Sequence, residues 1–253
     1  MIKSSFIILD GVSYIKEKSI WDSGIHSWDS FLGEKKVRGI SAKMKLFHDY
    51  QIKEAKTELH NENSSYFKSR LPSSEMWRLY EYFKEDCCFL DIETTGLHSG
   101  AYITVVGLFD GYDTKTMIQG INLDIKALKD ELKKYKMFVT FNGSSFDIPF
   151  IRKRYPNLLP DIPNFDLKLA CNNLGMKGGL KRVEELLGIK RENEIVQNLR
   201  GGDAVTLWRM YKGSGDEHYL KLLVQYNEED IINLKYIANY TAREMKKKLG
   251  LPA

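Results

Sequence analysis

Cysteine is scarce in this chain, and the arrangement of its three cysteines excludes two kinds of architecture. Cys87 and Cys88 are adjacent and Cys171 stands alone, so the sequence offers neither a disulfide framework nor the C-x-x-C spacing of a zinc site. Such cysteine usage is typical of a reducing compartment. We therefore expect a cytoplasmic protein.

Long apolar segments are also missing. The longest stretch without an acidic or basic residue, Thr94 to Phe109, is interrupted by Thr, His, Ser and Gly. Near the N-terminus, a short apolar run from Phe6 to Leu9 follows Lys3. Neither a membrane span nor a signal peptide fits these patterns, and no membrane partner is expected.

The excess of charge of one sign is small. The sequence has 38 Lys and Arg against 34 Asp and Glu, a net charge of +4. This balance permits binding to nucleic acid but does not demand it. Only six of the 253 residues are proline and 43% are hydrophobic, which excludes a disordered or collagen-like chain. The length fits one large domain, or a medium domain with a small appendage.

Two similar turns punctuate the first 60 residues. Gly11-Val12-Ser13 and Gly39-Ile40-Ser41 lie 28 residues apart, and a helix-compatible run follows each of them, over 14–21 and 42–59. Between them, Ser27 can cap another helix. The unit resembles a tandem helix-hairpin-helix module, although serine replaces the second glycine of the usual turn in both copies. The resemblance implies a module that docks substrate or a protein partner.

A polar segment marks the boundary that follows this module. Residues 61–75 are rich in Ser and Asn and include Pro72, a composition typical of a linker. We therefore predict three parts: a helical module over 1–60, a linker over 61–75 and the main domain over 76–253.

Beyond residue 86, the hydrophobic pattern changes from helical to extended. The predicted strands cover 87–93, 102–109, 114–119, 137–141 and 162–166. The predicted helices cover 124–135, a segment from about 145, 179–187, 202–211 and 216–240. Three antiparallel strands followed by alternating helices and parallel strands are the order of a ribonuclease H-like sheet. We predict an α/β fold in which helices flank a mixed five-stranded sheet, with the small all-helical module at the N-terminus.

The first candidate site residues are two acids at the end of the first predicted strand. Asp91 and Glu93 are two residues apart, so both carboxylates point to the same face of the sheet and can share a cation. The small-residue loop Thr94-Thr95-Gly96 follows them, where a ligand can approach the backbone. The structural alternative is a solvated strand end.

A further acid, Asp147, follows the predicted strand 137–141. Asn142-Gly143 turns the chain, and Ser144 or Ser145 is expected to cap the next helix. Asp147 then lies at a helix N-terminus, beside the carboxyl end of a strand that adjoins the one carrying Asp91. Taken alone, such an aspartate is more often a partner of the helix dipole than a metal ligand.

The last candidate pair, Tyr226 and Asp230, lies within the predicted helix 216–240. The two residues are one turn apart and share a helix face. This spacing is common by chance, and Tyr82 and Asp86 also have it. Only the later pair follows both other acidic clusters in the chain.

Together, the three clusters resemble the DEDD exonuclease superfamily, which contains the DnaQ-like and polymerase-proofreading nucleases. Asp91-Ile92-Glu93-Thr94-Thr95-Gly96 matches the first motif, the segment from Asn142 to Phe150 the second, and Tyr226-x-x-x-Asp230 the third in its tyrosine form. Gly178-Gly179-Leu180-Lys181 and the stretch from Ala204 to Tyr211 further resemble the YprB-like branch.

The resemblance implies a centre with two Mg²⁺ or Mn²⁺ ions, since carboxylate oxygens suit these metals. The implied metal ligands are Asp91, Glu93, Asp147 and Asp230, and together with Tyr226, which would orient the attacking water, they are the predicted catalytic residues.

The resemblance also implies a set of substrate contacts. Thr94, Thr95 and Leu97 would line the pocket of the terminal nucleotide, and Asn142 and Phe146 would contact the strand. The structural alternative for Phe146 is a hydrophobic staple at the start of a helix.

The implied activity is a 3′–5′ exonuclease that releases mononucleotides from single-stranded nucleic acid. We expect DNA rather than RNA because the second motif matches that of proofreading polymerases, and we expect a role in DNA repair or processing, with a helicase or another repair protein as a candidate partner. One alternative is a 3′–5′ exoribonuclease that trims RNA. Another is a non-catalytic nucleic-acid-binding subunit, which would be expected to have lost at least one of the acids.

Overall fold

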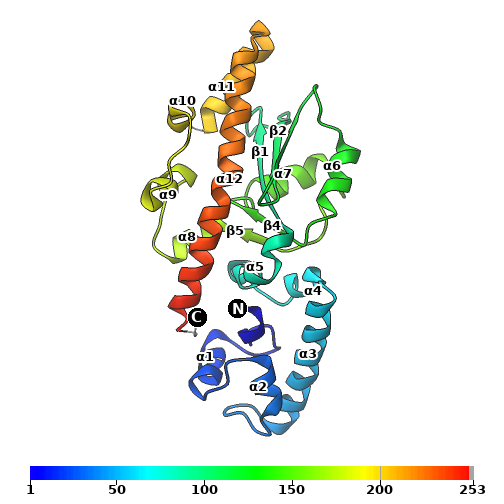
Figure 1. Ribbon diagram of the computed structural model, residues 1–253. Coiled ribbons are helices and arrows are strands. Elements are labelled where there is room, and N and C mark those ends of the chain that lie inside the picture. The colour runs from blue at the N-terminus through cyan, green and yellow to red at the C-terminus, as the bar shows by residue number, and fades with distance from the viewer. Residues whose placement is uncertain (200, 251–253) are drawn as a thin grey trace.

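A mixed sheet of five strands forms the centre of the computed structural model, which describes residues 1–199 and 201–250 (Figure 1). The strands are β1 (Cys87–Thr94), β2 (Ile103–Phe109), β3 (Thr114–Ile118), β4 (Met137–Thr140) and β5 (Asn164–Asp166). Their order is β3-β2-β1-β4-β5, in which β1, β2 and β3 pair antiparallel while β4 and β5 continue the sheet in parallel. The predicted fold class is confirmed.

Seven helices are described after the sheet begins. They are α6 (Ile125–Leu132), α7 (Asp147–Arg154), α8 (Leu167–Asn173), α9 (Leu180–Leu187), α10 (Glu194–Asn198), α11 (Gly201–Ser214) and α12 (Glu217–Lys248). The short helices α8 and α10 were not predicted, because each has only one or two turns and shows no long periodic pattern. Within 1–199 and 201–250, no helix is both long enough and apolar enough to cross a membrane.

The alternation of side chains along β1 divides the core into two layers. Leu90 and Ile92 pack in one layer with Leu128 of α6. Phe89 packs in the other layer with Ile231 of α12, the long helix that crosses the sheet in Figure 1. Because side chains alternate along a strand, positions 91 and 93 face the α12 layer.

The start of α7 differs from the prediction. The helix begins at Asp147, and no side chain caps it, so the expected cap by Ser144 or Ser145 is wrong. The backbone of this turn is instead satisfied by other groups. The N–H of Ser144 donates to Oδ2 of Asp166 at 3.0 Å, and that of Ser145 donates to the carbonyl of Asn142 at 3.0 Å.

The N-terminal residues form the helices α1 (Tyr14–Asp22), α2 (Trp28–Gly33) and α3 (Ala42–His60), as the sequence predicts. The two similar turns have the same conformation: Gly11 and Gly39 have φ angles of 73° and 75°, which suit glycine. Ser13 and Ser41 then cap α1 and α3 by accepting backbone N–H groups.

The segment 61–75 contains helix α4 (Ser64–Lys68) and a 3-10 turn (Ser73–Glu75), and α5 (Trp77–Phe83) follows it. Phe67 is fully buried and its ring stacks on Trp28 of α2, with 6.4 Å between the ring centroids. Leu71 is buried as well. The division into module, linker and main domain stays a prediction.

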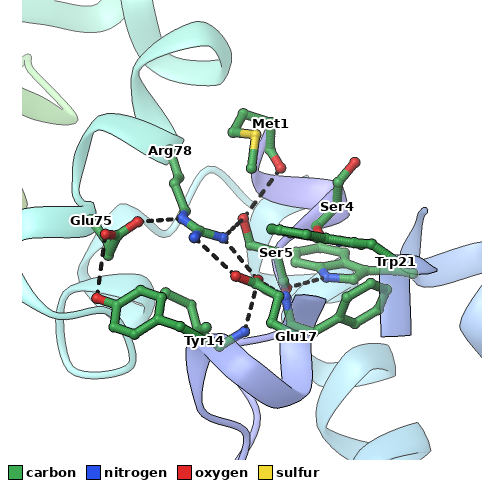
Figure 2. Close-up of polar contacts among 11 residues, drawn as sticks. Met1, Ser4, Ser5, Tyr14, Glu17, Trp21, Glu75 and Arg78 are labelled. Atoms are coloured by element: carbon green, nitrogen blue, oxygen red, sulfur yellow. Dashed lines mark hydrogen bonds and ion pairs between the residues drawn. The ribbon is translucent and has the colours of Figure 1, made fainter. Parts of the chain in front are cut away.

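A buried ion pair joins the N-terminal helices to α5 (Figure 2). The side chain of Arg78, on α5, has no exposed surface; its Nη1 and Nη2 donate to the two carboxylate oxygens of Glu17, on α1, at 2.8 and 2.9 Å. Its Nε donates to Glu75 at 2.6 Å. The Glu17 carboxylate also accepts the backbone N–H of Phe6 at 2.6 Å. Such a network holds α1 against α5 because breaking it leaves a buried charge unpaired.

Candidate active site

Strand β1 presents two acidic side chains to the α12 layer of the core. Asp91 is half-buried and Glu93 is buried. The strand before them, Cys87 to Leu90, is buried and apolar, so it places both acids at the edge of the core. As predicted, the two carboxylates lie on the same side of the sheet, and an oxygen atom of one lies within 4.8 Å of an oxygen atom of the other.

Helix α12 supplies the facing residues. Tyr226 and Asp230 are both buried and lie one turn apart on the side that packs against β1 and β2. Oxygen atoms of Asp91, Glu93 and Asp230 lie within 4.8 Å of one another. The first and last acidic clusters of the sequence therefore meet across the interface between the sheet and α12.

Asp147 lies beside this group of three, at the first residue of α7. Its Oδ1 accepts the backbone N–H of Ile92 at 3.1 Å, which ties the start of α7 to the residue between the two acids of β1. Asp147 is buried, and its charge acts on the carboxyl groups of both Asp91 and Glu93. All four predicted acids thus converge, although the tight group contains three of them.

Burial and mutual repulsion raise the pKa of every carboxyl group in this site. The pKa values of Asp91 and Glu93 lie well above their ordinary range, because both groups are desolvated and face other carboxylates. Burial raises the pKa of Asp147 to about 7, although the N–H of Ile92 favours its charged form. Burial raises the pKa of Asp230 to about 6, despite the opposing effect of Arg191.

The donor set fits a divalent metal ion. Among the described residues the group consists of carboxylates alone, with neither histidine nor cysteine. Carboxylate oxygens are preferred by Mg²⁺ and Mn²⁺, and a bound cation would offset the repulsion that raises these pKa values. The group of Asp91, Glu93 and Asp230 can therefore hold such an ion.

Two further residues near Asp91 were not predicted from the sequence. Asn227 is fully buried on α12, and its Nδ2 donates to Oδ2 of Asp91 at 2.8 Å. Gly107 of β2 is the antiparallel partner of Asp91, and it leaves the space that Asn227 occupies, since a Cβ at 107 would lie 2.0 Å from Oδ1 of Asn227. Asn227 precedes Asp230 by three residues on the same predicted helix, which is the signal that the sequence offers. The register of β2 against β1 is visible only in the structure.

A cation next to Asp230 was also missed. Arg191, in the loop between α9 and α10, forms ion pairs with Asp230 and with Glu184 of α9. All three side chains are buried. In the sequence, Arg191 stands in the ordinary charged segment Lys190-Arg191-Glu192, which gives no signal of this position.

The predicted substrate residues at the end of β1 and just after it belong to a short loop. Thr94 is buried, and its hydroxyl bonds to the backbone of Gly96, while the hydroxyl of Thr95 accepts the N–H of Tyr102 at 3.1 Å. Leu97 is 84% exposed. The two threonines therefore shape the loop, and Leu97 is available for an external contact.

The other two predicted substrate residues lie in the turn before α7. Asn142 adopts a positive φ of 66°, and its side-chain oxygen accepts from Lys168 at 3.2 Å. The ring of Phe146 packs against Phe150, with 5.7 Å between the ring centroids. Phe146 is the N-cap residue of α7, one position after the N′ residue of a hydrophobic staple, so its contact with Phe150 joins the N-cap to the first turn of the helix. The role of Phe146 in substrate binding stays a prediction.

Comparisons with known proteins show what this chain is similar to. A family model described as the RNase_H superfamily matches residues 88–242. The uncharacterized protein YprB of Bacillus subtilis (strain 168) is 29% identical over 177 residues, a match that covers 60% of this chain and 41% of that protein. The family B DNA polymerase of the hyperthermophilic archaeon Pyrobaculum calidifontis matches in structure with a TM-score of 0.47 and 17% identity, over 64% of this chain and 24% of the polymerase chain.

Proposed function

This chain belongs to the RNase_H superfamily, and on that premise we propose that it is a divalent-metal-dependent 3′–5′ exonuclease of the tyrosine DEDD type that acts on single-stranded DNA. The observation that carries the proposal is the convergence of Asp91, Glu93 and Asp230 within 4.8 Å, with Asp147 beside them. The first and last of these acids, Asp91 and Asp230, lie more than a hundred residues apart in the sequence. Repulsion among the buried carboxylates opposes their charged forms unless a cation is bound.

Two Mg²⁺ or Mn²⁺ ions are the proposed cofactors. Asp91, Glu93 and Asp230 would hold one ion, and Asp147 together with Asp91 would hold the other. When bound, such ions neutralise the scissile phosphate, lower the pKa of a water and stabilise the leaving 3′-oxygen.

The protein groups around the ions have separate tasks. Burial raises the pKa of Tyr226, and the neighbouring acids raise it further, so its hydroxyl keeps its proton and acts as a hydrogen-bond partner that orients the attacking water. Asn227 fixes the orientation of Asp91. The exposed side chain of Leu97 is the proposed contact for the terminal base, next to the loop that Thr94 and Thr95 hold.

The proposed polarity of cleavage rests on the resemblance that the three ordered motifs carry. The proposed preference for DNA rests on the second motif, from Asn142 to Phe150, which matches that of proofreading polymerases. The proposed role in DNA repair or processing rests on the same resemblance.

A labelled-strand assay tests the proposal. Single strands of DNA and RNA with the same sequence and a 5′ label are incubated with Mn²⁺, Mg²⁺ or a chelator. We expect a ladder of DNA products that shorten from the 3′ end in either metal, no products in chelator, and a loss of at least about 100-fold in the Asp147→Asn variant. Asp130→Asn, which makes the same change at an exposed position of α6, should keep the parent rate.

Other outcomes have distinct meanings. Products in the presence of chelator, or equal rates in the parent and Asp147→Asn, would contradict a metal nuclease with this site. Faster shortening of RNA would assign the alternative exoribonuclease activity, and binding of both strands without cleavage would assign a non-catalytic subunit.

A further inference from the structure

Arg191 occupies an unusual place for a cation, because it lies beside acids that are proposed to bind metal. It follows α9 in the loop that leads to α10. Its Nη2 donates to Oδ1 of Asp230 and also to Oε1 of Glu184, the latter at 2.9 Å, while its Nε donates to Oε2 of Glu184 at 3.0 Å. The guanidinium therefore bridges a proposed metal ligand and a second carboxylate.

Glu184 anchors the guanidinium in one position. It accepts two hydrogen bonds from Arg191 in the forked geometry that suits a carboxylate, and a third from Nδ2 of Asn233 at 2.9 Å. Asn233 lies one turn after Asp230 on α12, so the network closes between α9 and α12. The side chains of Glu184 and Arg191 are 4% and 2% exposed, and a buried charge with this pairing cannot swing out at low cost.

Arg191 also contacts the other functional residue of α12. Its guanidinium carbon lies 5.4 Å from the centre of the Tyr226 ring. Its remaining nitrogen, Nη1, is buried and has no hydrogen-bond acceptor among the described residues. The side-chain hydrogen bonds of the guanidinium therefore go to the carboxylates of Glu184 and Asp230, which hold it in place.

We propose that Arg191 is a positioning residue: clamped by Glu184, it holds Oδ1 of Asp230 and thereby fixes the orientation in which this carboxylate faces Asp91 and Glu93. The inference rests on the proposed function in one respect, namely that Asp230 is a metal ligand. It adds a residue, with its anchor Glu184, that lies outside the three motifs.

The direction in which metal affinity changes when Arg191 is replaced distinguishes a positioning role from simple competition with the metal for Asp230. If Arg191 merely competed with the metal for Asp230, its removal would increase the negative potential of the site and tighten metal binding. If Arg191 positions Asp230, its removal frees the carboxylate to rotate, and metal binding weakens although a positive charge has been lost. The fixed anchor on Glu184 favours positioning.

The experiment measures Mn²⁺ binding by calorimetry in the full-length parent and in three variants. We expect Arg191→Gln to weaken Mn²⁺ affinity at least tenfold. Arg191→Lys keeps the charge but not the fork, so it should also weaken the affinity at least fivefold. Lys190→Gln, which removes an exposed positive charge from the neighbouring position, should leave the affinity within twofold. Melting curves in chelator verify that each variant is folded; should Arg191→Gln fail to fold, Arg191→Lys decides the question.

Two results would overturn the proposal: tighter or unchanged Mn²⁺ binding in Arg191→Gln, or parent-like affinity in Arg191→Lys. Strand hydrolysis supplies a second readout. We expect kcat to fall at least tenfold in Arg191→Gln while KM for the strand changes less than threefold. A loss of activity that comes from a higher KM alone, with kcat unchanged, would count against positioning. Absence of hydrolysis in the parent would refute the proposed nuclease function, whereas the Mn²⁺ measurements test Arg191 without it.

Discussion

Asn227 donates from its side-chain nitrogen to Oδ2 of Asp91 at 2.8 Å, across the interface between α12 and β1. Asn227 can lie there because position 107 of the neighbouring strand is glycine. The buried amide of Asn227 therefore orients Asp91, the carboxylate proposed to bind both metal ions. The missing side chain at Gly107 in turn leaves room for that amide. The geometry of the site therefore depends on Gly107, a residue that has no side chain to bind a metal ion.

A methyl group at position 107 should disturb the site from behind. In Gly107→Ala, the new Cβ would meet Oδ1 of Asn227 at 2.0 Å, so Asn227 must move and release Asp91. We expect Mn²⁺ affinity, measured by calorimetry, to fall at least about tenfold and the free energy of unfolding to fall by about 1 to 3 kcal/mol. Gly213→Ala, in α11 with open space around the new Cβ, should change neither quantity for the worse. Parent-like Mn²⁺ binding in Gly107→Ala would show that Asn227 does not control Asp91.

The raised pKa of Asp147 should make the metal-free protein less stable as the pH rises. Between the ordinary pKa of 3.8 and the folded-state value of about 7, the folded protein retains a proton that the unfolded chain has released. Stability is therefore lost with increasing pH across this window. The Asp147→Asn variant has no titrating carboxyl group at this position. In chelator, the free energy of unfolding of the variant minus that of the parent should therefore rise by about 2 kcal/mol from pH 5 to pH 8.

Urea unfolding at both pH values measures this difference for Asp147→Asn, and Asp130→Asn provides the exposed control. A difference between Asp147→Asn and the parent that does not vary with pH would show that the carboxyl group titrates normally in the folded state.

Tyr226 should contribute to turnover but not to metal binding. Because burial raises the pKa of Tyr226, the hydroxyl stays protonated, and Tyr226→Phe removes a hydrogen-bond partner without changing the charge of the site. We expect roughly a 100-fold lower rate of strand hydrolysis with Mn²⁺ affinity within threefold of the parent. Tyr236→Phe, the same change at an exposed position of α12, serves as the control. An unchanged rate in Tyr226→Phe would show that the Tyr226 hydroxyl does not orient the attacking water, and would contradict its assigned role.

The buried ion pair between Glu17 of α1 and Arg78 of α5 should contribute strongly to the free energy of unfolding. In Glu17→Gln, the fully buried guanidinium loses a charged partner, and we expect the free energy of unfolding to fall by about 3 kcal/mol. Asp22→Asn removes the partner of Lys18 on the same helix, where the side chains are 64% and 72% exposed, and should cost less than about 1 kcal/mol. Similar losses in urea unfolding of the two variants would mean that the buried pair is no more important than a surface pair.

Much of the sheet and of the acidic site could be predicted from the sequence. The run from Cys87 to Glu93 is apolar up to its acids, and the order of strands and helices then limits how the chain can be arranged. The spacing of Tyr226 and Asp230 is encoded in the helical period. These features depend on neighbouring residues, and a local pattern is sufficient to reveal them.

The remaining features depend on contacts between distant segments. Gly107 faces Asn227 because of the register of β2 against β1, and Arg191 reaches Asp230 because of the path of a loop. Helix α4 forms within a polar segment because Phe67 can pack on Trp28, a residue 39 positions earlier in the chain. No local periodicity encodes such pairings, so the sequence could not reveal them.

The most direct test of the proposed metal site is the anomalous diffraction of manganese in crystals of the parent protein grown or soaked with Mn²⁺. We expect a peak among the carboxylate oxygens of Asp91, Glu93 and Asp230, at roughly 2.0 to 2.4 Å from them, and the loss of that peak in crystals of Asp91→Asn. A peak located elsewhere, or parent crystals in saturating Mn²⁺ with no peak among these oxygens, would contradict a metal centre at this position.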